Sequence, residues 1–475
     1  MRPLGLEPSA RPAVIDAGSD TILSYAELID RARDVSGQLG DARQLLFLFA
    51  RNDLFGAVTY AAALLGHQPI ALLDAKNPAA SAAGLVTTYA PAWIAGPVGI
   101  GQQLASAGVP IERVVAAEGG ELARTGYPDG LALHPDLAVM LTTSGTTGSS
   151  KFVRLSQANL DANATSIAGY LGLTESERPI TSLPIHYSFG LSVLNSHWLA
   201  KATVVMTGES LIQKPFWEIV ERYQCTSLAG VPYTYQMLER VGFRNMTLPS
   251  LHTLQQAGGA LDRRLAEAYA AHMAERGGRF FVMYGQTEAT ARIAYVPPDR
   301  LADKLGSAGV AIPGGQLSIE PSSPETTDGR VTGEVVYRGA NVMLGYADGP
   351  ADLARGDELN GVLRTGDVGY LDGDGFLFLV GRSKRIAKVF GLRVNLDEIE
   401  ARLREHGPAA VVGGQDRIWA FCAFGSDDSV GALAESFARD YRLHRSALEF
   451  RHIDEIPTTS SGKTDYRQVD AWTTD

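Results

Sequence analysis

The amino-acid sequence predicts an α/β fold in which mostly parallel sheets are layered with helices. Short apolar runs alternate with segments of helical periodicity in the first part of the chain, as sheets covered by helices require. After residue 306, glycine-rich turns separate strand-like runs, which indicates a β-rich subdomain. After residue 382 the pattern is mixed again, which predicts a small α+β domain. With 475 residues, 45% of them hydrophobic, the chain has core material for two or three such units.

The first part of the chain begins with a clear alternation of helix and strand. Residues 26–39 have the periodicity of an amphipathic helix, and LLFLFA at 45–50 is typical of a buried strand. A second apolar helix at 53–65 and a second strand at 69–73 repeat the pattern. Further strands are expected at residues 93–95, 111–116, 136–141, 180–183, 203–207, 227–229, 253–256 and 279–284. Ligands of such sheets collect at the carboxyl ends of the strands.

One main boundary divides the chain. We expect a large domain over residues 1–382, with its β-rich subdomain at about 306–382, and a small domain over 383–475. DGDG at 372–375 is a turn signal inside the β-rich part. In the small domain, strands are expected at 389–394, 409–413 and 418–424, and helices at 396–406 and 430–441.

The composition argues against several classes of partner. A net charge of -11 disfavours nucleic-acid binding by general electrostatics. Cys225 and Cys422 are far apart in the chain and form neither a disulfide framework nor a metal-ligand spacing. No apolar stretch approaches the length that spans a bilayer, and the start lacks the apolar region of a signal peptide. We therefore expect a cytoplasmic protein with no membrane and no nucleic-acid partner.

The most informative stretch is LTTSGTTGSSK at residues 141–151, between a buried strand and a helix that Ser156 can cap. Glycine lets backbone N–H groups approach a phosphate, hydroxyls add donors, and Lys151 adds a positive charge. The spacing is not that of a Walker loop, because Ser150 follows Gly145 by five residues and Phe152 follows the lysine. A flexible linker is the alternative, but a linker needs neither a terminal lysine nor a buried strand before it. The stretch therefore predicts a phosphate-binding loop.

Three further segments offer reactive side chains, each with a structural alternative. YGQTE at 284–288 follows a strand and offers an aromatic face, a hydroxyl and a carboxylate for Mg²⁺, or is a simple strand-to-turn junction. RTGD at 364–367 presents Asp367 to ribose hydroxyls, with Arg382 nearby, although Gly-Asp pairs are also common in turns. IPTTSSGK at 456–463 ends in Lys463, which taken alone would be a solvated surface lysine.

Together these segments resemble the adenylate-forming superfamily of acyl-CoA synthetases, adenylation domains and beetle luciferase. TSGTTGSSK is similar to the phosphate loop of that family, YGQTE to its nucleotide and magnesium motif, and RTGD to its ribose motif. GRSKRIAKVFGLRVNLDEIE is similar to its hinge and the start of its small lid domain, and SSGK to the loop of its catalytic lysine. GGA at 258–260, GSAGVAIPG at 306–314 and LPIHYSFGL at 183–191 agree. The resemblance runs from about residue 23 to residue 463.

The resemblance implies roles for the residues that match the nucleotide-binding motifs. Tyr284 and Gly285 would lie along the adenine with Gly259 and Ala260 nearby, and Asp367 would bind the ribose hydroxyls with help from Arg382. Glu288 would hold Mg²⁺. The β- and γ-phosphates would be bound by Thr143, Ser144, Gly145, Thr146, Thr147, Gly148 and Lys151.

The resemblance also implies the catalytic residues. Lys463 would bridge the carboxylate and the α-phosphate, and Thr287 would contact the α-phosphate. His186 would gate the carboxylate, or is simply a packed histidine. The small domain would be a mobile lid that rotates about Lys384 and carries Lys463, while Lys388 and Gly391 would line the site of the second step.

The implied activity is ATP- and Mg²⁺-dependent activation of a carboxylic acid to an acyl-adenylate, with CoA or the phosphopantetheine of a carrier protein as acceptor. Residues 184–195 contain no acid that could pair with an α-amino group. An uncharged aryl or fatty acyl acid is therefore favoured over an α-amino acid. The alternatives are transfer to an amine, activation of another oxyanion such as nitrite, and a non-catalytic nucleotide-binding scaffold, which would have no need of a mobile lysine.

Overall fold

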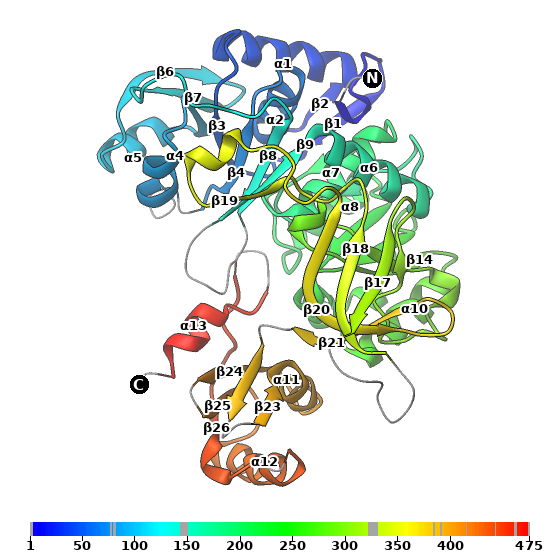
Figure 1. Cartoon of the computed structure of the whole chain (residues 1–475). Coiled ribbons are helices and arrows are strands. Elements are labelled where there is room, and N and C mark those ends of the chain that lie inside the picture. The colour runs from blue at the N-terminus through cyan, green and yellow to red at the C-terminus, as the bar shows by residue number, and fades with distance from the viewer. Residues whose placement is uncertain are drawn as a thin grey trace.

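A computed structural model of the chain describes residues 3–76, 78, 82–142, 151–321, 331–382, 385–389, 392–414, 416–441, 443–459 and 463–473. Two large sheets with their helices form the main body, and a smaller body near the C-terminus lies below it in Figure 1. The predicted α/β class is confirmed, with parallel strands in the centre of both large sheets and antiparallel strands at their edges.

The first large sheet has the strand order β16-β15-β14-β13-β12-β10-β11-β1-β2. Its strands are β1 (Pro12–Asp16), β2 (Thr21–Ser24), β10 (Pro179–Ile180), β11 (Val204–Met206), β12 (Ser227–Gly230), β13 (Thr253–Gln256), β14 (Arg279–Tyr284), β15 (Ala294–Val296) and β16 (Val310–Ala311). β12, β13 and β14 are parallel neighbours, with Gly230 opposite Gln256 and Gln256 opposite Val282. Their carboxyl ends therefore meet at one edge of the sheet.

The second large sheet has the strand order β19-β9-β8-β4-β3-β5-β7-β6. Its strands are β3 (Leu46–Ala50), β4 (Ile70–Asp74), β5 (Trp93–Pro97), β6 (Ile111–Ala117), β7 (Gly120–Thr125), β8 (Leu137–Thr142), β9 (Phe152–Ser156) and β19 (Gly345–Ala347). β19 comes from far along the chain and pairs with β9, so the segment after residue 344 is fixed next to the end of the stretch that is predicted to bind phosphate.

The helices begin where the sequence supplies caps. The predicted cap at Ser156 is confirmed, since its hydroxyl accepts from the backbone of Asn159 and the Asn159 side chain accepts in return. Ser24 and Glu27 form the same motif at α1. The main-body helices are α1 (Tyr25–Leu39), α2 (Leu54–Leu65), α4 (Thr87–Tyr89), α5 (Ile100–Ser106), α6 (Gln157–Leu171), α7 (Ser188–Leu199), α8 (Lys214–Arg222), α9 (Pro232–Arg240) and α10 (Arg263–Glu275).

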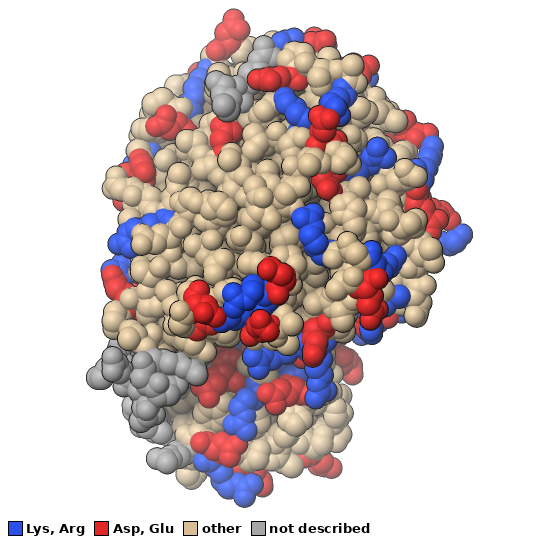
Figure 2. All heavy atoms as spheres, turned by 90° about the vertical axis from the view of Figure 1, so that its right-hand side faces the viewer, with Lys and Arg blue, Asp and Glu red and all other residues tan. Residues whose placement is uncertain are grey.

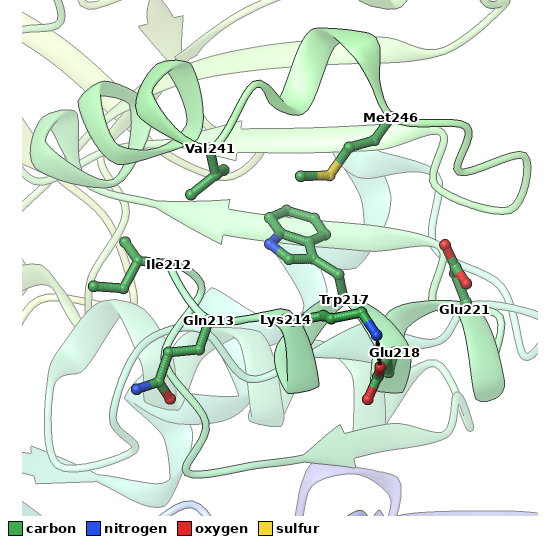
Figure 3. A pocket seen from close by; sticks show the side chains of 8 residues that line it. All are labelled: Ile212, Gln213, Lys214, Trp217, Glu218, Glu221, Val241 and Met246. Atoms are coloured by element: carbon green, nitrogen blue, oxygen red, sulfur yellow. Dashed lines mark ion pairs between the residues drawn. The ribbon is translucent and has the colours of Figure 1, made fainter.

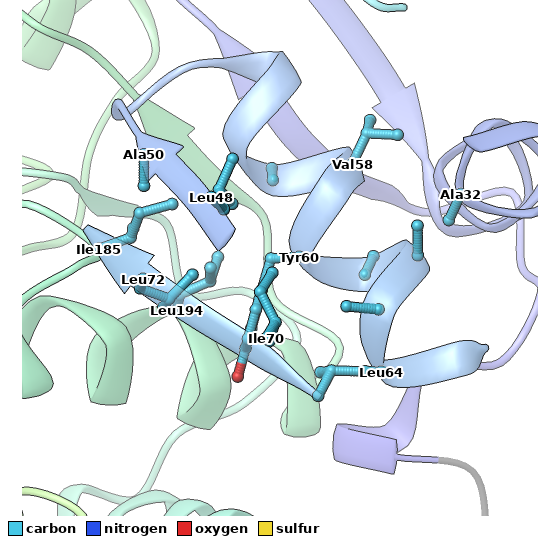
Figure 4. Packing of buried hydrophobic residues seen from close by; sticks show 14 of the residues in the cluster. Ala32, Leu48, Ala50, Val58, Tyr60, Leu64, Ile70, Leu72, Ile185 and Leu194 are labelled. Carbon is cyan, nitrogen blue, oxygen red and sulfur yellow. The ribbon is translucent and has the colours of Figure 1, made fainter. Parts of the chain in front are cut away.

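The core of the main body lies between the two large sheets. Tyr60 of α2, Ile70 of β4, Leu194 of α7 and Ile185 of the loop before α7 pack together there (Figure 4). α2 is buried at almost every position, because it contacts neighbours on all sides. Burying apolar side chains at about 25 cal/mol per Å² makes this cluster a large source of stability.

One expected strand is shorter than the sequence suggests. Residues 180–183 were expected to form a strand, but β10 ends at Ile180. Beyond it the hydroxyls of Thr181 and Ser182 donate to backbone carbonyls, and Pro184 has no N–H for a sheet. The chain therefore leaves the sheet early and enters the loop that carries His186.

The β-rich part forms a separate sheet of order β17-β18-β20-β21, made of β17 (Gln316–Pro321), β18 (Gly333–Arg338), β20 (Val362–Leu371) and β21 (Leu377–Arg382).

The C-terminal body contains β22 (Ile386–Val389), β23 (Leu392–Asn395), β24 (Ala409–Gly414), β25 (Arg417–Cys422), β26 (Leu448–His452), α11 (Leu396–Arg404), α12 (Asp427–Asp440) and α13 (Tyr466–Ala471). It has a hydrophobic core of its own. The single strand expected at 389–394 is wrong, because Val389 ends one strand of an antiparallel pair and Leu392 begins the other.

The charged side chains alternate in sign over the face shown in Figure 2, so this face has no continuous basic patch. The described part of the chain contains no helix that is long and apolar enough to span a bilayer. Both Cys225 and Cys422 are buried, and neither forms a disulfide bond.

Candidate active site

Several predicted site residues of the main body lie at the carboxyl ends of β10, β13 and β14 or in the loops that follow them. Gly258, Gly259 and Ala260 come directly after β13, and Tyr284 is the last residue of β14. The carbonyl of Gly259 accepts a 2.8 Å hydrogen bond from the buried side chain of Gln256, which fixes this loop to its strand. The carboxyl edge of a parallel sheet is where ligands bind in such folds.

Tyr284 and Asp367 belong to two different sheets and are joined directly. The Tyr284 hydroxyl donates to Oδ2 of Asp367, which is 7% exposed. Asp367 lies on β20, opposite Arg382 of β21 in the antiparallel register. An aromatic ring and a carboxylate are therefore held side by side, as binding of a base and a ribose would require.

The turn after β14 holds Thr287 next to α7. Its hydroxyl is 3.1 Å from the hydroxyl of Ser188, the first residue of α7. Gly285 is required here, because a Cβ at this position would lie 1.8 Å from the carbonyl oxygen of Ala291. The tight turn returns the chain toward the sheet and leaves Thr287 and Glu288 at its tip.

Glu288, Tyr346 and Lys151 form a polar group on one side of this turn. The Tyr346 hydroxyl donates to Oε1 of Glu288 at 2.7 Å, and Lys151 Nζ lies 5.6 Å from the centre of the Tyr346 ring. Burial and the nearby Glu288 carboxylate raise the pKa of Tyr346, so its hydroxyl stays protonated. Lys151 also pairs with Asp348 at 3.2 Å.

Lys463 approaches the same edge from the C-terminal body. Its Nζ lies 5.1 Å from the centre of the Tyr187 ring. A Cβ on Gly258 would lie 3.6 Å from Cε of Lys463 and 2.7 Å from the Tyr187 hydroxyl, so the three residues are in close proximity. The lysine is held in a tight loop, because Thr458 pairs with Thr464 and the Thr459 N–H donates to the Lys463 carbonyl. A lysine that the sequence alone would leave in solvent is thus directed at the site.

His186 lies in the loop between β10 and α7, on the side of the second sheet. Its Nε2 is 3.9 Å from Oδ2 of Asp74, while its Nδ1 is buried and without a hydrogen-bond partner in the described structure. Burial lowers the pKa of His186, and the Asp74 carboxylate opposes this shift. The ring is therefore mainly neutral at pH 7.

Some of the expected site residues cannot be placed. Thr143, Ser144, Gly145, Thr146, Thr147, Gly148, Lys384 and Gly391 lie outside the described residues. For Arg382 and Lys388 the backbone alone is described, in β21 and β22.

Ser188, Tyr346 and Asp74 are neighbours of the site that the sequence analysis did not identify. Ser188 is 99 residues from Thr287 in the chain, and Tyr346 is 58 residues from Glu288. Tyr346 lies in a three-residue strand without a recognisable motif, so no sequence signal could have identified it.

The acidic side chains at the site fit a magnesium ion that is held mainly by phosphates. The described residues contain no cluster of three or more His, Cys, Asp or Glu side chains arranged to bind a metal. Mg²⁺ commonly takes one or two carboxylates together with substrate phosphates and water. Glu288 supplies one such carboxylate at the tip of the turn.

A surface pocket of about 460 Å³ lies elsewhere, beside α8 (Figure 3). Trp217 and Met246 form its apolar part, and Lys214 and Glu218 form an exposed ion pair at 2.8 Å. None of the predicted site residues lines this pocket.

Comparison with known proteins gives a consistent result. The profile of the AMP-binding enzyme family matches residues 6–347. A 2-succinylbenzoate–CoA ligase of Bacillus pumilus is 32% identical over 343 residues, which is 69% of this chain and 67% of the relative. A feruloyl-CoA synthase of Amycolatopsis is 30% identical over 345 residues, which is 69% of this chain and 68% of the relative. The solved structure of an o-succinylbenzoate coenzyme A synthetase from Bacillus subtilis with ATP and magnesium has a TM-score of 0.76 at 24% identity, covering 97% of this chain and 96% of the other.

Proposed function

The chain belongs to the AMP-binding enzyme family. On that premise we propose how its side chains catalyse the reaction of an AMP-forming acid–thiol ligase. The enzyme uses ATP and Mg²⁺ to convert a carboxylic acid to an acyl-adenylate with release of pyrophosphate, and then transfers the acyl group to a thiol. The relatives named for 2-succinylbenzoate, ferulate and sulfoacetate are all CoA ligases or synthases, which supports CoA as the thiol.

The nucleotide is proposed to bind along β14 and β20. Tyr284 would stack on the adenine beside Gly259 and Ala260, and Asp367 would accept hydrogen bonds from the ribose hydroxyls. The direct bond between Tyr284 and Asp367 supports this assignment, because it holds the ring and the carboxylate at one site. Lys151 and the loop from Thr143 to Gly148 would bind the β- and γ-phosphates, and Arg382 would assist at the ribose.

The first step is attack of a carboxylate oxygen on the α-phosphorus, with cleavage of the bond to the β-phosphate oxygen and departure of pyrophosphate. Lys463 is the group that we propose brings the carboxylate and the α-phosphate together, since both are anions that repel each other. Thr287 would donate to a non-bridging oxygen. Mg²⁺ held by Glu288 would supply further positive charge to the phosphates.

The position of Lys463 is the observation that carries this proposal. Its Nζ lies over Tyr187 at 5.1 Å and its Cε is close to Gly258, although the residue belongs to the C-terminal body. A non-catalytic nucleotide-binding scaffold would have no need of a cation supplied by a second body. The position therefore favours adenylation over binding alone.

In the second step the thiol sulfur attacks the acyl carbonyl carbon, AMP leaves, and the thiol proton passes to solvent. We propose that the C-terminal body, residues 383–475, is a mobile lid that rotates about Lys384 and withdraws Lys463. Lys388 and Gly391 would then line the thiol entrance. A carrier-protein phosphopantetheine is a second possible acceptor.

The acid is proposed to be a small aryl or fatty acyl acid and not an α-amino acid. Residues 184–195 supply no carboxylate for an ammonium group. The Tyr187 ring next to Lys463 belongs to an apolar and aromatic cluster that includes Phe189 and Val231. His186 would lie near the reacting carboxylate.

The test is pyrophosphate release from ATP with a panel of carboxylic acids and with nitrite, for the natural protein and for Lys463→Ala. We expect release with at least one acid, and a loss of about 10²- to 10⁴-fold in kcat for the variant with ATP affinity within a few-fold of normal. Lys463→Arg is the matched control, because it keeps the charge and changes its geometry. Normal ATP binding without release for any acid would favour the scaffold, and equal rates for Lys463→Ala would remove Lys463 from the mechanism.

The acceptor is identified by adding CoA, a carrier protein or an amine to preformed adenylate. Formation of a thioester with CoA is the expected result. Formation of an amide alone would instead assign the protein to the amine-transferring alternative.

A further inference from the structure

Arg292 is a fully buried arginine whose charge has no counter-charge nearby. It follows the turn after β14 and is 0% exposed. No Asp or Glu pairs with it in the part of the chain that the structure describes. Its Nη1 donates to the sulfur of Met283 at 2.6 Å, its Nη2 donates to the Ser192 hydroxyl at 3.2 Å, and its Nε has no hydrogen-bond partner.

Arg154 shows what a satisfied buried arginine looks like in the same molecule. It is also 0% exposed, but its guanidinium forms an ion pair with Glu358. It also donates to the backbone carbonyls of Tyr346, at 3.1 Å, and Arg355. The comparison shows that the fold can supply a carboxylate and carbonyls to a buried guanidinium, and that it does not do so at Arg292.

The partners of Arg292 are weak substitutes for an anion. A thioether sulfur is a poor acceptor, and a hydroxyl carries no charge. The centre of the Phe189 ring lies 4.1 Å from Cζ of Arg292, which adds a cation–π contact. Burial lowers the pKa of Arg292, yet an arginine side chain stays charged in proteins. A buried charge in this condition is costly unless an anion completes its surroundings.

Arg292 lies at the inner end of the side chains that face Lys463. Lys463 Nζ is 5.1 Å from the Tyr187 ring, the Tyr187 and Phe189 rings are 6.4 Å apart, and the Phe189 ring contacts Arg292. These aromatic rings belong to one cluster with Met283, Val231 and Ala257. In this series of contacts the Tyr187 and Phe189 rings therefore lie between the two cations.

We propose that Arg292 binds a second carboxylate at the far end of the acid substrate, so that the enzyme activates a dicarboxylic acid on the carboxylate next to Lys463. The inference rests on the proposed function and departs from it in one respect: the acid carries an anionic tail in place of an uncharged aryl or fatty acyl tail. The spacer between the two carboxylates would lie against Tyr187 and Phe189. The Met283 side chain is flexible and would yield its contact with Nη1 to a carboxylate oxygen.

The geometry of the guanidinium suits this role. Arginine presents its N–H groups in a planar fork that matches the two oxygens of a carboxylate. The Nε–H of Arg292 is unused, and the Nη1–H is used only by sulfur. A monocarboxylic acid of the same length would leave the Nε–H and the Nη1–H of Arg292 without an oxygen acceptor. A buried donor that loses its acceptor makes an enzyme discriminate strongly against the substrate that lacks it.

The experiment compares matched monocarboxylic and dicarboxylic acids, from succinate to sebacate and including the benzene dicarboxylates, by pyrophosphate release. For the natural protein we expect kcat/KM for the best dicarboxylic acid to exceed that of its monocarboxylic counterpart by about 100-fold. Arg292→Met should abolish this preference mainly by raising KM for the dicarboxylic acid, and Arg292→Lys should restore part of it.

Arg154→Met is the matched control, since it removes an equally buried arginine outside the cluster. It should lower the melting temperature while leaving the ratio between dicarboxylic and monocarboxylic acids unchanged. The substrate preference of the natural protein alone can overturn the proposal, so the test does not depend on the folding of Arg292→Met.

Equal or better use of monocarboxylic acids by the natural protein would overturn the role of Arg292 and leave the ligase activity intact. The role of Arg292 would also be overturned if Arg154→Met changed the ratio of kcat/KM between dicarboxylic and monocarboxylic acids as much as Arg292→Met does. Absence of release with every acid, despite ATP binding, would overturn the proposed function and not this inference alone.

Discussion

The proposed nucleotide side and the proposed acid side of the site differ in how their polar groups are paired. On the nucleotide side the groups pair with each other, as Tyr284 does with Asp367 and Tyr346 with Glu288. On the acid side, buried nitrogen atoms of His186 and Arg292 have no hydrogen-bond partner within the described structure. The difference teaches that these nucleotide-side groups already have partners within the fold, whereas the acid side retains polar groups for which the fold supplies none.

Removal of the Asp367 carboxylate should have the largest effect among the following tests of this comparison. Asp367→Ala removes the proposed acceptor for the ribose hydroxyls, and we expect kcat/KM for ATP to fall by about 100-fold, as for a charged hydrogen-bond pair. Steady-state kinetics with varied ATP measures this. Tyr284→Phe is the control, because it keeps the ring and should cost less than about tenfold. An unchanged KM for ATP in Asp367→Ala would separate Asp367 from the nucleotide.

His197 of α7 is fully buried, and it gives a prediction about the pH dependence of stability. Burial lowers the pKa of His197 to about 4, the Val193 carbonyl and Glu177 oppose the shift, and the charge of Arg292 adds to it. The unfolded chain binds a proton on this histidine near pH 6.5, whereas the native state does so only near pH 4. Stability from this residue is therefore present above pH 6.5 and is lost as the pH falls toward 4.

We expect protonation of His197 in the unfolded chain to lower the free energy of unfolding by about 2 kcal/mol when the pH falls from 7 to 5. Urea unfolding at the two pH values, for the natural protein and for His197→Gln, measures the difference. The variant should show a smaller loss on acidification. The same loss in both proteins would show that His197 does not contribute to the pH dependence.

The smallest expected effect concerns the Tyr346 hydroxyl on the nucleotide side. Tyr346→Phe keeps the ring over Lys151 and removes the donor that orients Glu288, so the Mg²⁺ concentration for half-maximal activity should rise by about tenfold. Titration of activity with Mg²⁺ at saturating ATP measures it. Tyr370→Phe is a control on the β-rich sheet. An unchanged or lower Mg²⁺ requirement in Tyr346→Phe would contradict the proposed role of Glu288.

Much of the fold followed from periodicity and caps. The α/β class and the cap at Ser156 are confirmed. After residue 306, β17, β18, β20 and β21 form a sheet of their own, while β16 and β19 join the two large sheets. The errors occurred where local apolar runs carry no information about pairing. Residues 181–183 are apolar or small, yet they leave the sheet because their hydroxyls bond to other strands.

The sequence also identified part of the candidate site, namely the residues that lie in recognisable motifs. Tyr284, Thr287, Glu288, Asp367 and Lys463 were named from motifs, because each lies in a short segment of distinctive composition. Their roles remain predictions. Tyr346 and Ser188 were not named, since their importance arises from contacts across 58 and 99 residues of chain.

The sequence by itself determined the order of the motifs, the presence of the Ser/Thr/Gly-rich stretch that is predicted to bind phosphate, and the family. These depend on local composition and spacing, which a chain carries in any conformation. Only the tertiary structure decided that Lys463 of one body faces Tyr187 of another, and that Arg292 is buried without a carboxylate while Arg154 has one. Burial and pairing depend on which elements pack together, and the two arginines cannot be told apart until α7, β9 and β14 are in place.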